Sequence, residues 1–214
     1  MELKLNIPNS LNEITLGQYQ EFEKLDLTNE SKVHLKMIEI FCNVPEIVAR
    51  NIKATDVAEI CGIINNMFDT KHQLINSFEL EGQEYSFIPS LQDMSFGEYI
   101  DLDTFIGDTE NLHRAMNVLY RPIELKQGKR YTLKEYDPES NEIAKDFPLD
   151  AVLGAIVFFY SLGKDLSLTM MNSLDKANQE TLAQHLISHP NTDGTTASLQ
   201  SLTEILQSLK ISLN

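Results

Sequence analysis

Tryptophan is absent from this chain, cysteine occurs twice, and basic residues are few. The 214 residues include 17 lysines and arginines against 32 aspartates and glutamates, so the formal net charge is −15 at pH 7. Proteins that bind nucleic acid need basic patches to replace the counterions of phosphate. The composition therefore argues against direct nucleic-acid binding, while the acidity favours solubility and permits a basic protein partner.

Membrane and disulfide signals are also scarce. Cys42 and Cys61 each lie in an apolar helical pattern, so we expect buried free thiols in a reducing compartment. The longest apolar run, 151–160, is too short to span a bilayer and indicates a buried core helix. The opening MELKLNIPNS lacks the basic and then apolar pattern of a secretion signal. No membrane association is expected.

Motifs of catalysis and metal binding are missing as well. The sequence contains no GxSxG and no HExxH, and Gly163-Lys164 lacks the other residues of a phosphate-binding loop. Asp101 and Asp103 lack the remaining ligands of an EF-hand. His185 and His189 have a spacing that can bind a metal, but no third ligand is evident. We expect no enzyme, no cofactor and no metal, although catalytic residues can assemble from distant positions.

A repeated stretch is the strongest positive signal. Residues 11–25, LNEITLGQYQEFEKL, recur with a constant offset of 80 residues as 91–105, LQDMSFGEYIDLDTF. Thr15 and Ser95 suit the N-cap of a helix, because a hydroxyl there accepts from the backbone N–H three residues on. Gln18 and Glu98 stand at that third position and can bond the N–H of the cap residue. The sequence predicts a capping box in each copy.

The context of the two copies also matches. Each follows an extended, alternating segment that ends in Ile-Pro, at 2–8 and at 76–89. Capping boxes are common in helical proteins, so two of them need not indicate a duplication, but the matching context favours one. We expect a mainly α fold with short β-hairpins (α+β), built as a tandem duplication of a strand–three-helix unit plus a C-terminal helix.

Hydrophobic spacing places the expected elements along the chain. In the first unit we expect helices at about 16–25, from about 32 to 43, and at 56–68 with Thr55 as its N-cap. The second unit should begin with a hairpin at 76–88 around Glu81-Gly82-Gln83. It should continue with helices at 96–105 and 109–120, the second of them capped by Asp108, and an inserted hairpin or loop at about 123–147. Helices at 149–162, with Pro148 at its first position, and 166–187 should complete it.

The predicted boundaries follow from these elements. We expect a first helical repeat at 1–76, a second at 77–188 with its inserted hairpin, a linker at 189–196 and a docking helix at 197–214. The docking helix carries leucines that alternate steps of three and four residues, as in a coiled-coil seam: Leu199, Leu202, Leu206, Leu209 and Leu213. This seam either folds back on its own domain or inserts into a partner.

Two longer stretches resemble a known family. They are FELEGQEYSFIPSLQDMSFGEYIDLDTFIGDTENLHRAMNVLYRPI and KDFPLDAVLGAIVFFYSLGKDL, which together span about 78–165. They resemble virion and tail-assembly proteins of tailed bacteriophages of the crAss-like group, whose members are similar to tail assembly chaperones in size and acidity. The resemblance brings no catalytic residues with it.

The expected function follows from this resemblance. It implies a non-catalytic structural or assembly protein of the phage, acting through protein–protein contacts in the neck, the tail or the capsid interior as cargo. The expected partners are other phage structural proteins or further copies of the chain, in the virion or in the host cytoplasm during assembly. One alternative is a tail assembly chaperone that binds the tape-measure or tail protein and then leaves. The other is an acidic host-directed effector that mimics DNA.

Overall fold

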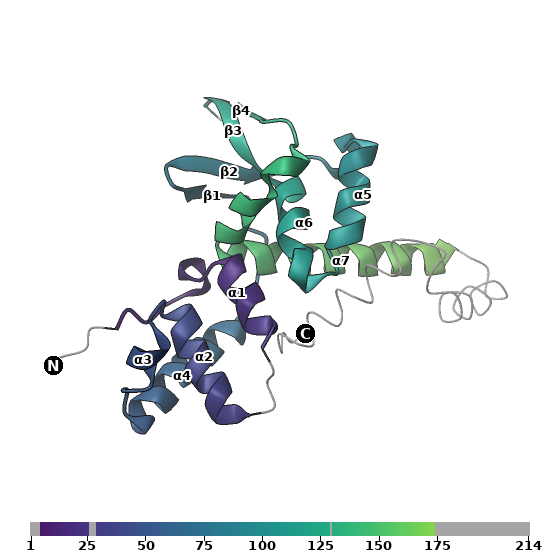
Figure 1. Ribbon diagram of the computed structural model, residues 1–214. Helices are drawn as coiled ribbons and strands as arrows, with labels where there is room; N and C mark the ends of the chain where they lie inside the picture. The colour runs from purple at the N-terminus through teal and green to yellow at the C-terminus, as the bar shows by residue number, and fades with distance from the viewer. Residues whose placement is uncertain (1–4, 26–28, 129, 174–214) are drawn as a thin grey trace.

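The first half of the chain is helical. The structure is a computed structural model that describes residues 5–25, 29–128 and 130–173 (Figure 1). After a 3₁₀ turn come four α-helices, in which α2 is capped by Asn29 and α2 and α4 pack on one another. Their bounds are η1 Leu11–Glu13, α1 Leu16–Glu23, α2 Glu30–Phe41, α3 Glu46–Ala49 and α4 Ala54–Phe68.

The second half adds a four-stranded antiparallel sheet in the order β1-β2-β3-β4. Its strands are β1 Ser77–Leu80, β2 Gln83–Phe87, β3 Tyr120–Gln127 and β4 Arg130–Leu133. Glu81 and Gly82 join β1 to β2 with positive φ angles of 51° and 80°. Two positive φ angles define the type I′ turn that matches the twist of a hairpin, so the predicted hairpin is confirmed at its predicted tip.

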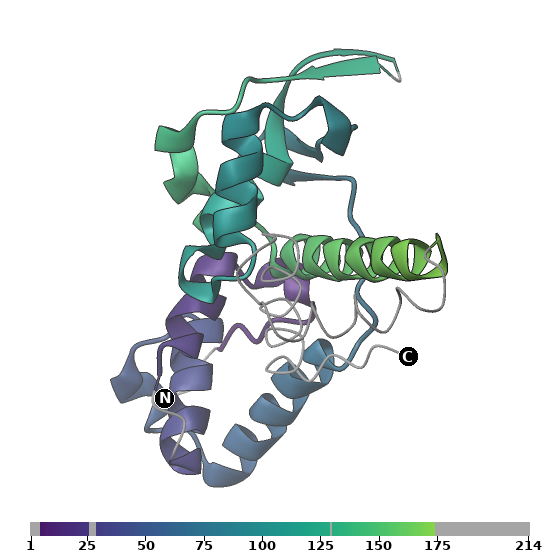
Figure 2. The ribbon, with the colours of Figure 1, turned by 90° about the vertical axis from the view of Figure 1, so that its right-hand side faces the viewer.

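Helices pack around this sheet and complete an α+β fold. The helix α5 packs along α6, and the long helix α7 extends away from the sheet (Figures 1 and 2). The remaining elements are η2 Leu91–Asp93, α5 Phe96–Phe105, η3 Thr109–Asn111, α6 Leu112–Leu119, η4 Pro138–Asp146 and α7 Leu149–Ser173. The expected fold class, mainly α with short β-hairpins, is confirmed. Among the described residues, no helix combines the length and apolar character that crossing a bilayer requires.

An aromatic cluster fixes the sheet to the start of α7. The rings of Phe78, Tyr85 and Phe147 lie with centroids 5.0–5.6 Å apart, and Tyr120 packs beside them. Tyr120 and Phe147 are fully buried. Burial raises the pKa of Tyr120, whose hydroxyl lies 2.7 Å from the carbonyl oxygen of Ile75. The neutral phenol thereby links the sheet to the segment between α4 and β1, which contains Ile75.

The connection between the halves crosses α7 at a glycine. Figure 2 shows the segment after α4 passing alongside α7. A Cβ atom placed on Gly154 would meet the carbonyl oxygen of Gln73, well inside van der Waals contact. A residue without a side chain is therefore required where this connection crosses the helix.

Three expected elements are wrong. Residues 5–8 of the predicted first strand have no regular secondary structure and do not join the sheet formed by β1–β4. Thr55 does not cap α4, since the helix begins at Ala54 with Lys53 as its N-cap, and the Thr55 hydroxyl bonds the Asp56 carboxylate. The helices expected at 149–162 and 166–187 have no break between them, because α7 continues through Gly163 to Ser173.

Two predicted boundaries also shift. Pro148 precedes α7 rather than occupying its first turn, and its carbonyl accepts the first backbone bonds of the helix. The inserted hairpin forms, but β3 already begins at Tyr120, where the preceding helix was expected to end. In both halves a 3₁₀ turn leads into a capped helix, with η1 and η2 at the predicted offset, but in the second half β3, β4 and η4 stand between α6 and α7. The tandem duplication and the domain boundaries built on it stay predictions.

Candidate functional site

Both predicted capping boxes form, and the first ties α1 to its neighbours. The Thr15 hydroxyl accepts from the backbone N–H of Gln18 at 3.2 Å, and the Gln18 side chain accepts from the N–H of Thr15 at 2.9 Å. The Gln18 amide also donates to the carbonyl of Ile40 at the end of α2, at 2.7 Å. The side chain that completes the cap therefore also anchors α1 on α2.

The start of α1 is covered by a segment from the other half. The N–H of Leu16 donates to the Phe147 carbonyl at 3.0 Å, and the N–H of Leu149 donates to the Ile14 carbonyl at 2.9 Å. These two bonds flank an antiparallel bridge between Thr15 and Pro148. A proline fits there because the flanking residues make both bonds, so no N–H is needed from the proline itself. Ile14 and Leu16 are fully buried beneath this Thr15–Pro148 bridge.

A buried polar contact fixes the other side of α1. The Gln20 amide donates to the carbonyls of Thr109 and Glu110 at 2.8 Å and 3.0 Å, and lies 3.2 Å from Nδ1 of His113. The role of Nδ1 in this contact depends on the tautomer of the imidazole. Burial lowers the pKa of His113, which favours the neutral imidazole. Figure 1 shows α1 accordingly between α2–α4 and the second half.

The second capping box has the same local geometry. The Ser95 hydroxyl accepts from the N–H of Glu98, whose side chain accepts in turn from the N–H of Ser95. The Glu98 carboxylate is buried and forms an ion pair of 2.7 Å with Arg121 on β3. This pair anchors the start of α5 on the sheet, as Gln18 anchors α1 on α2.

The outer face of α5 differs from that of α1. Phe96, Tyr99 and Ile100 are 78%, 45% and 45% exposed. The corresponding first-copy residues Leu16, Tyr19 and Gln20 are 0%, 2% and 5% exposed. Phe96, Tyr99 and Ile100 follow the spacing i, i+3, i+4, so they form one stripe along the helix, which we call the α5 stripe. The positions buried in the first copy are thus open in the second.

The backbone beside the α5 stripe is open too. The N–H of Phe96 and the carbonyl of Met94 correspond to the groups of Leu16 and Ile14 that form the Thr15–Pro148 bridge. Neither takes part in a hydrogen bond within the described parts of the chain. A Cβ added to Gly17 would lie 3.2 Å from the carbonyl oxygen of Lys145, whereas one added to Gly97 would meet nothing within 4 Å. Among residues 5–25, 29–128 and 130–173, the second copy therefore presents the same edge without a covering segment.

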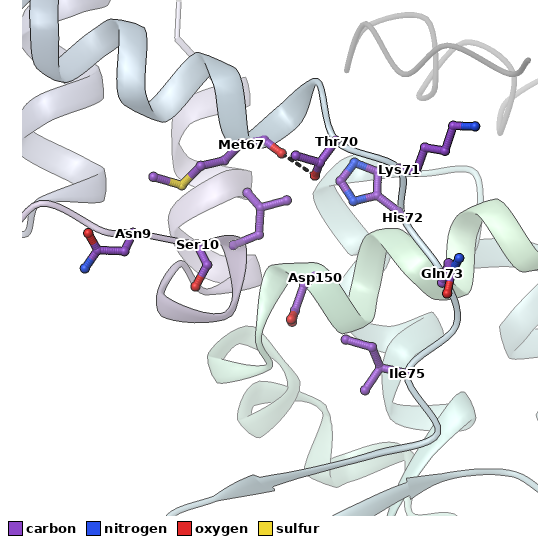
Figure 3. Close-up of a pocket in the computed structure, with 10 residues that line it drawn as sticks. Asn9, Ser10, Met67, Thr70, Lys71, His72, Gln73, Ile75 and Asp150 are labelled. Carbon is purple, nitrogen blue, oxygen red and sulfur yellow. Dashed lines mark hydrogen bonds between the residues drawn. The ribbon is translucent and has the colours of Figure 1, made fainter.

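A cavity of about 370 Å³ at the junction of the halves is the other candidate site. His72 and Asp150 both line it (Figure 3). Burial lowers the pKa of His72 and raises that of Asp150, although each charge favours the ionised form of the other. Nε2 of His72 is buried and has no hydrogen-bond partner among the described residues. Ser10 also lines the cavity, but its hydroxyl bonds the Asn12 side chain rather than the imidazole.

The other predicted site residues are placed as follows. Cys42 and Cys61 are free and buried, and burial raises the pKa of Cys42 to about 11, so its thiol stays protonated near neutral pH. Gly163 and Lys164 lie inside α7, where no phosphate-binding loop can form. Within the described residues no cluster of three metal-ligating side chains occurs. The histidines His185 and His189 and the leucine seam Leu199, Leu202, Leu206, Leu209 and Leu213 lie outside the described residues.

Comparison with known proteins gives no relative to guide the assignment. No family model, curated protein or solved structure matches the chain. The site must therefore be interpreted from its own geometry. Sequence reasoning placed the capping boxes but missed the α5 stripe, the Thr15–Pro148 bridge and the contact of Gln20 with His113. The stripe carried one readable signal, since Ile100 is apolar where the first copy has the polar Gln20.

Proposed function

We propose that this chain is a non-catalytic structural or assembly protein of a tailed, crAss-like bacteriophage that acts through protein–protein contacts. The observation that carries the proposal is the α5 stripe, with its large apolar side chains open to water beside a backbone edge that makes no hydrogen bond to the described residues. Contiguous exposed apolar side chains of this kind mark interaction sites. The resemblance of about 78–165 to phage assembly proteins supports the same assignment, since that range contains α5.

The stripe is held rigidly, as a binding surface should be. Glu98 anchors the first turn of α5 to Arg121, and the Tyr136 hydroxyl donates to the Asp101 carboxylate at 2.8 Å in the next turn. Leu102 is buried on the inner face of the helix. Because α5 is fixed on one face, little further ordering is needed when a partner binds the other, which favours affinity.

Purified virions test the proposal. A phage that carries Phe96→Ser with Tyr99→Ser should lose the chain from its particles or fail to assemble, because the polar substitutions remove apolar contact area. The control is Ile47→Ser, which alters an apolar side chain of similar exposure on α3. Mass spectrometry of the particles measures copy number. Normal incorporation of the double variant would contradict a role for the α5 stripe.

In the chaperone alternative, the chain binds through the same surface but does not remain in the particle. In that case the wild-type chain is absent from mature particles, and loss of the α5 stripe still blocks tail assembly. If the chain is absent and the stripe variants assemble normal particles, the acidic host-directed effector becomes the better hypothesis.

The leucine seam provides a second, independent contact to test. Deleting 190–214 should leave the melting temperature of the remaining chain unchanged and reduce incorporation or oligomerisation if the seam binds a partner. Four buried leucines contribute on the order of 6–12 kcal/mol before entropy is subtracted. A large drop in melting temperature with normal incorporation would instead show that the seam packs on its own domain.

A further inference from the structure

We propose that the α5 stripe and the open backbone edge at Met94 and Phe96 bind an extended segment of another protein. This segment carries a proline between two large apolar residues and has basic flanks. The inference rests on the proposed function and names the chemistry of the partner at the same surface. It is drawn from the way the Phe147–Leu149 segment covers the backbone edge at Ile14 and Leu16 in the first copy.

The Thr15–Pro148 bridge shows what such a surface accepts. In the sequence Phe147-Pro148-Leu149, the first residue contributes a carbonyl to Leu16 and the last contributes an N–H to Ile14. The central proline lies opposite Thr15. The proline ring also holds its residue and the one before it in extended backbone, which lowers the entropy lost on binding.

The second copy offers the matching groups. The N–H of Ser95 is already used by Glu98, and its carbonyl accepts from Tyr99 at 3.0 Å. The groups left on this edge are therefore the N–H of Phe96 and the carbonyl of Met94, one donor and one acceptor. The space above Gly97 is open, and the α5 stripe provides apolar contact beside it. An extended segment can make both backbone bonds here without any change in the capping box.

Charge decides which kind of chain supplies the segment. The exposed Asp93 precedes α5, and the helix carries Asp101 and Asp103 and no basic residue, while its Glu98 is already paired with Arg121. A second copy would bring another net charge of −15, and its Phe147–Leu149 segment is held in its own bridge. Repulsion therefore disfavours self-association, whereas lysine or arginine beside the apolar core of a partner segment would be attracted.

The probe is a fluorescent peptide, Ala-Lys-Lys-Phe-Pro-Leu-Lys-Lys, added to the full chain and followed by anisotropy and by amide NMR spectra. We expect saturable binding with a dissociation constant on the order of 10–100 μM, a range suited to a short segment. Amide shifts should centre on Phe96 and Gly97. Phe96→Ser with Tyr99→Ser should weaken binding at least about tenfold, equivalent to about 1.4 kcal/mol. The matched control Ile47→Ser should bind normally.

Two altered peptides examine the mode of binding. Methylation of the leucine nitrogen removes the donor for the Met94 carbonyl and should weaken binding about tenfold, as should exchange of the four lysines for glutamates. Equal binding of the methylated peptide, shifts centred on Leu16, no binding up to about 1 mM, or self-association of the chain through α5 would each overturn the inference. If the peptide fails while the stripe variants still abolish assembly, the proposed function stands and only this partner chemistry is wrong.

Discussion

Two glycines at the same position of the two capped helices should respond in opposite ways to alanine. Alanine in place of glycine within a helix contributes about 0.5–1 kcal/mol, because glycine loses more backbone freedom on folding. At Gly97 the new methyl group meets nothing within 4 Å, so Gly97→Ala should raise the free energy of unfolding by up to that amount.

At Gly17 the new methyl group would lie 3.2 Å from the Lys145 carbonyl oxygen and 3.3 Å from its Cβ. Lys145 lies in the last turn of the 3₁₀ segment η4, just before the Thr15–Pro148 bridge, so its backbone is held and cannot move away freely. Forcing an extra methyl group into a packed contact costs about 1–3 kcal/mol. This cost outweighs the helical gain, so Gly17→Ala should be destabilising by about 1 kcal/mol.

Urea unfolding of both variants, followed by circular dichroism, measures the difference, which should be about 2 kcal/mol. Hydrogen exchange at the Leu16 amide locates the effect. That N–H donates to the Phe147 carbonyl, beside the place where the new methyl group would press on Lys145. Equal shifts in both variants, or a stabilised Gly17→Ala with unchanged exchange at Leu16, would refute the assignment of α1 as the covered copy.

Three further outcomes follow from the structure. Thr15→Ala and Ser95→Ala should each lower the free energy of unfolding by about 1 kcal/mol in urea, since each removes a cap bond. Burial lowers the pKa of His113 below its ordinary 6.5, so the folded state binds fewer protons than the unfolded chain. Its contribution to stability is fully present above about pH 6.5 and is lost as the pH falls, and His113→Gln should flatten that slope in urea titrations at pH 5–8. Gly154→Ala should lower the free energy of unfolding by about 2–4 kcal/mol, visible as a reduced melting temperature, because a backbone must move.

Local signals were the predictable part of this fold. The capping boxes and the hairpin tip depend on residues within four positions of one another, so the chain shows them without tertiary information. The break expected between 162 and 166 does not occur, because the one glycine there costs a helix only about 1 kcal/mol and packing overrides it. The alternation at 2–8 also misled the prediction, because a strand needs a neighbour to pair with.

The site depended on contacts that no local pattern contains. Nothing near Thr15 in the sequence indicates that Pro148 will lie opposite it, and nothing near Gln20 indicates that its amide will contact His113. The exposure of Phe96 was equally hidden, because an apolar residue at that position suggests core. It becomes informative only beside the buried Leu16 of the first copy.

The Thr15–Pro148 bridge also sets an order of events during synthesis. Residues 11–25 leave the ribosome long before 147–149, so Ile14 and Leu16 stay without this cover until residue 149 of the 214 has emerged. Contacts between such distant segments slow folding, because a long loop must close before they form. During that interval the nascent chain carries two uncovered helix starts, and once Phe147–Leu149 has closed over α1 it keeps one, at α5.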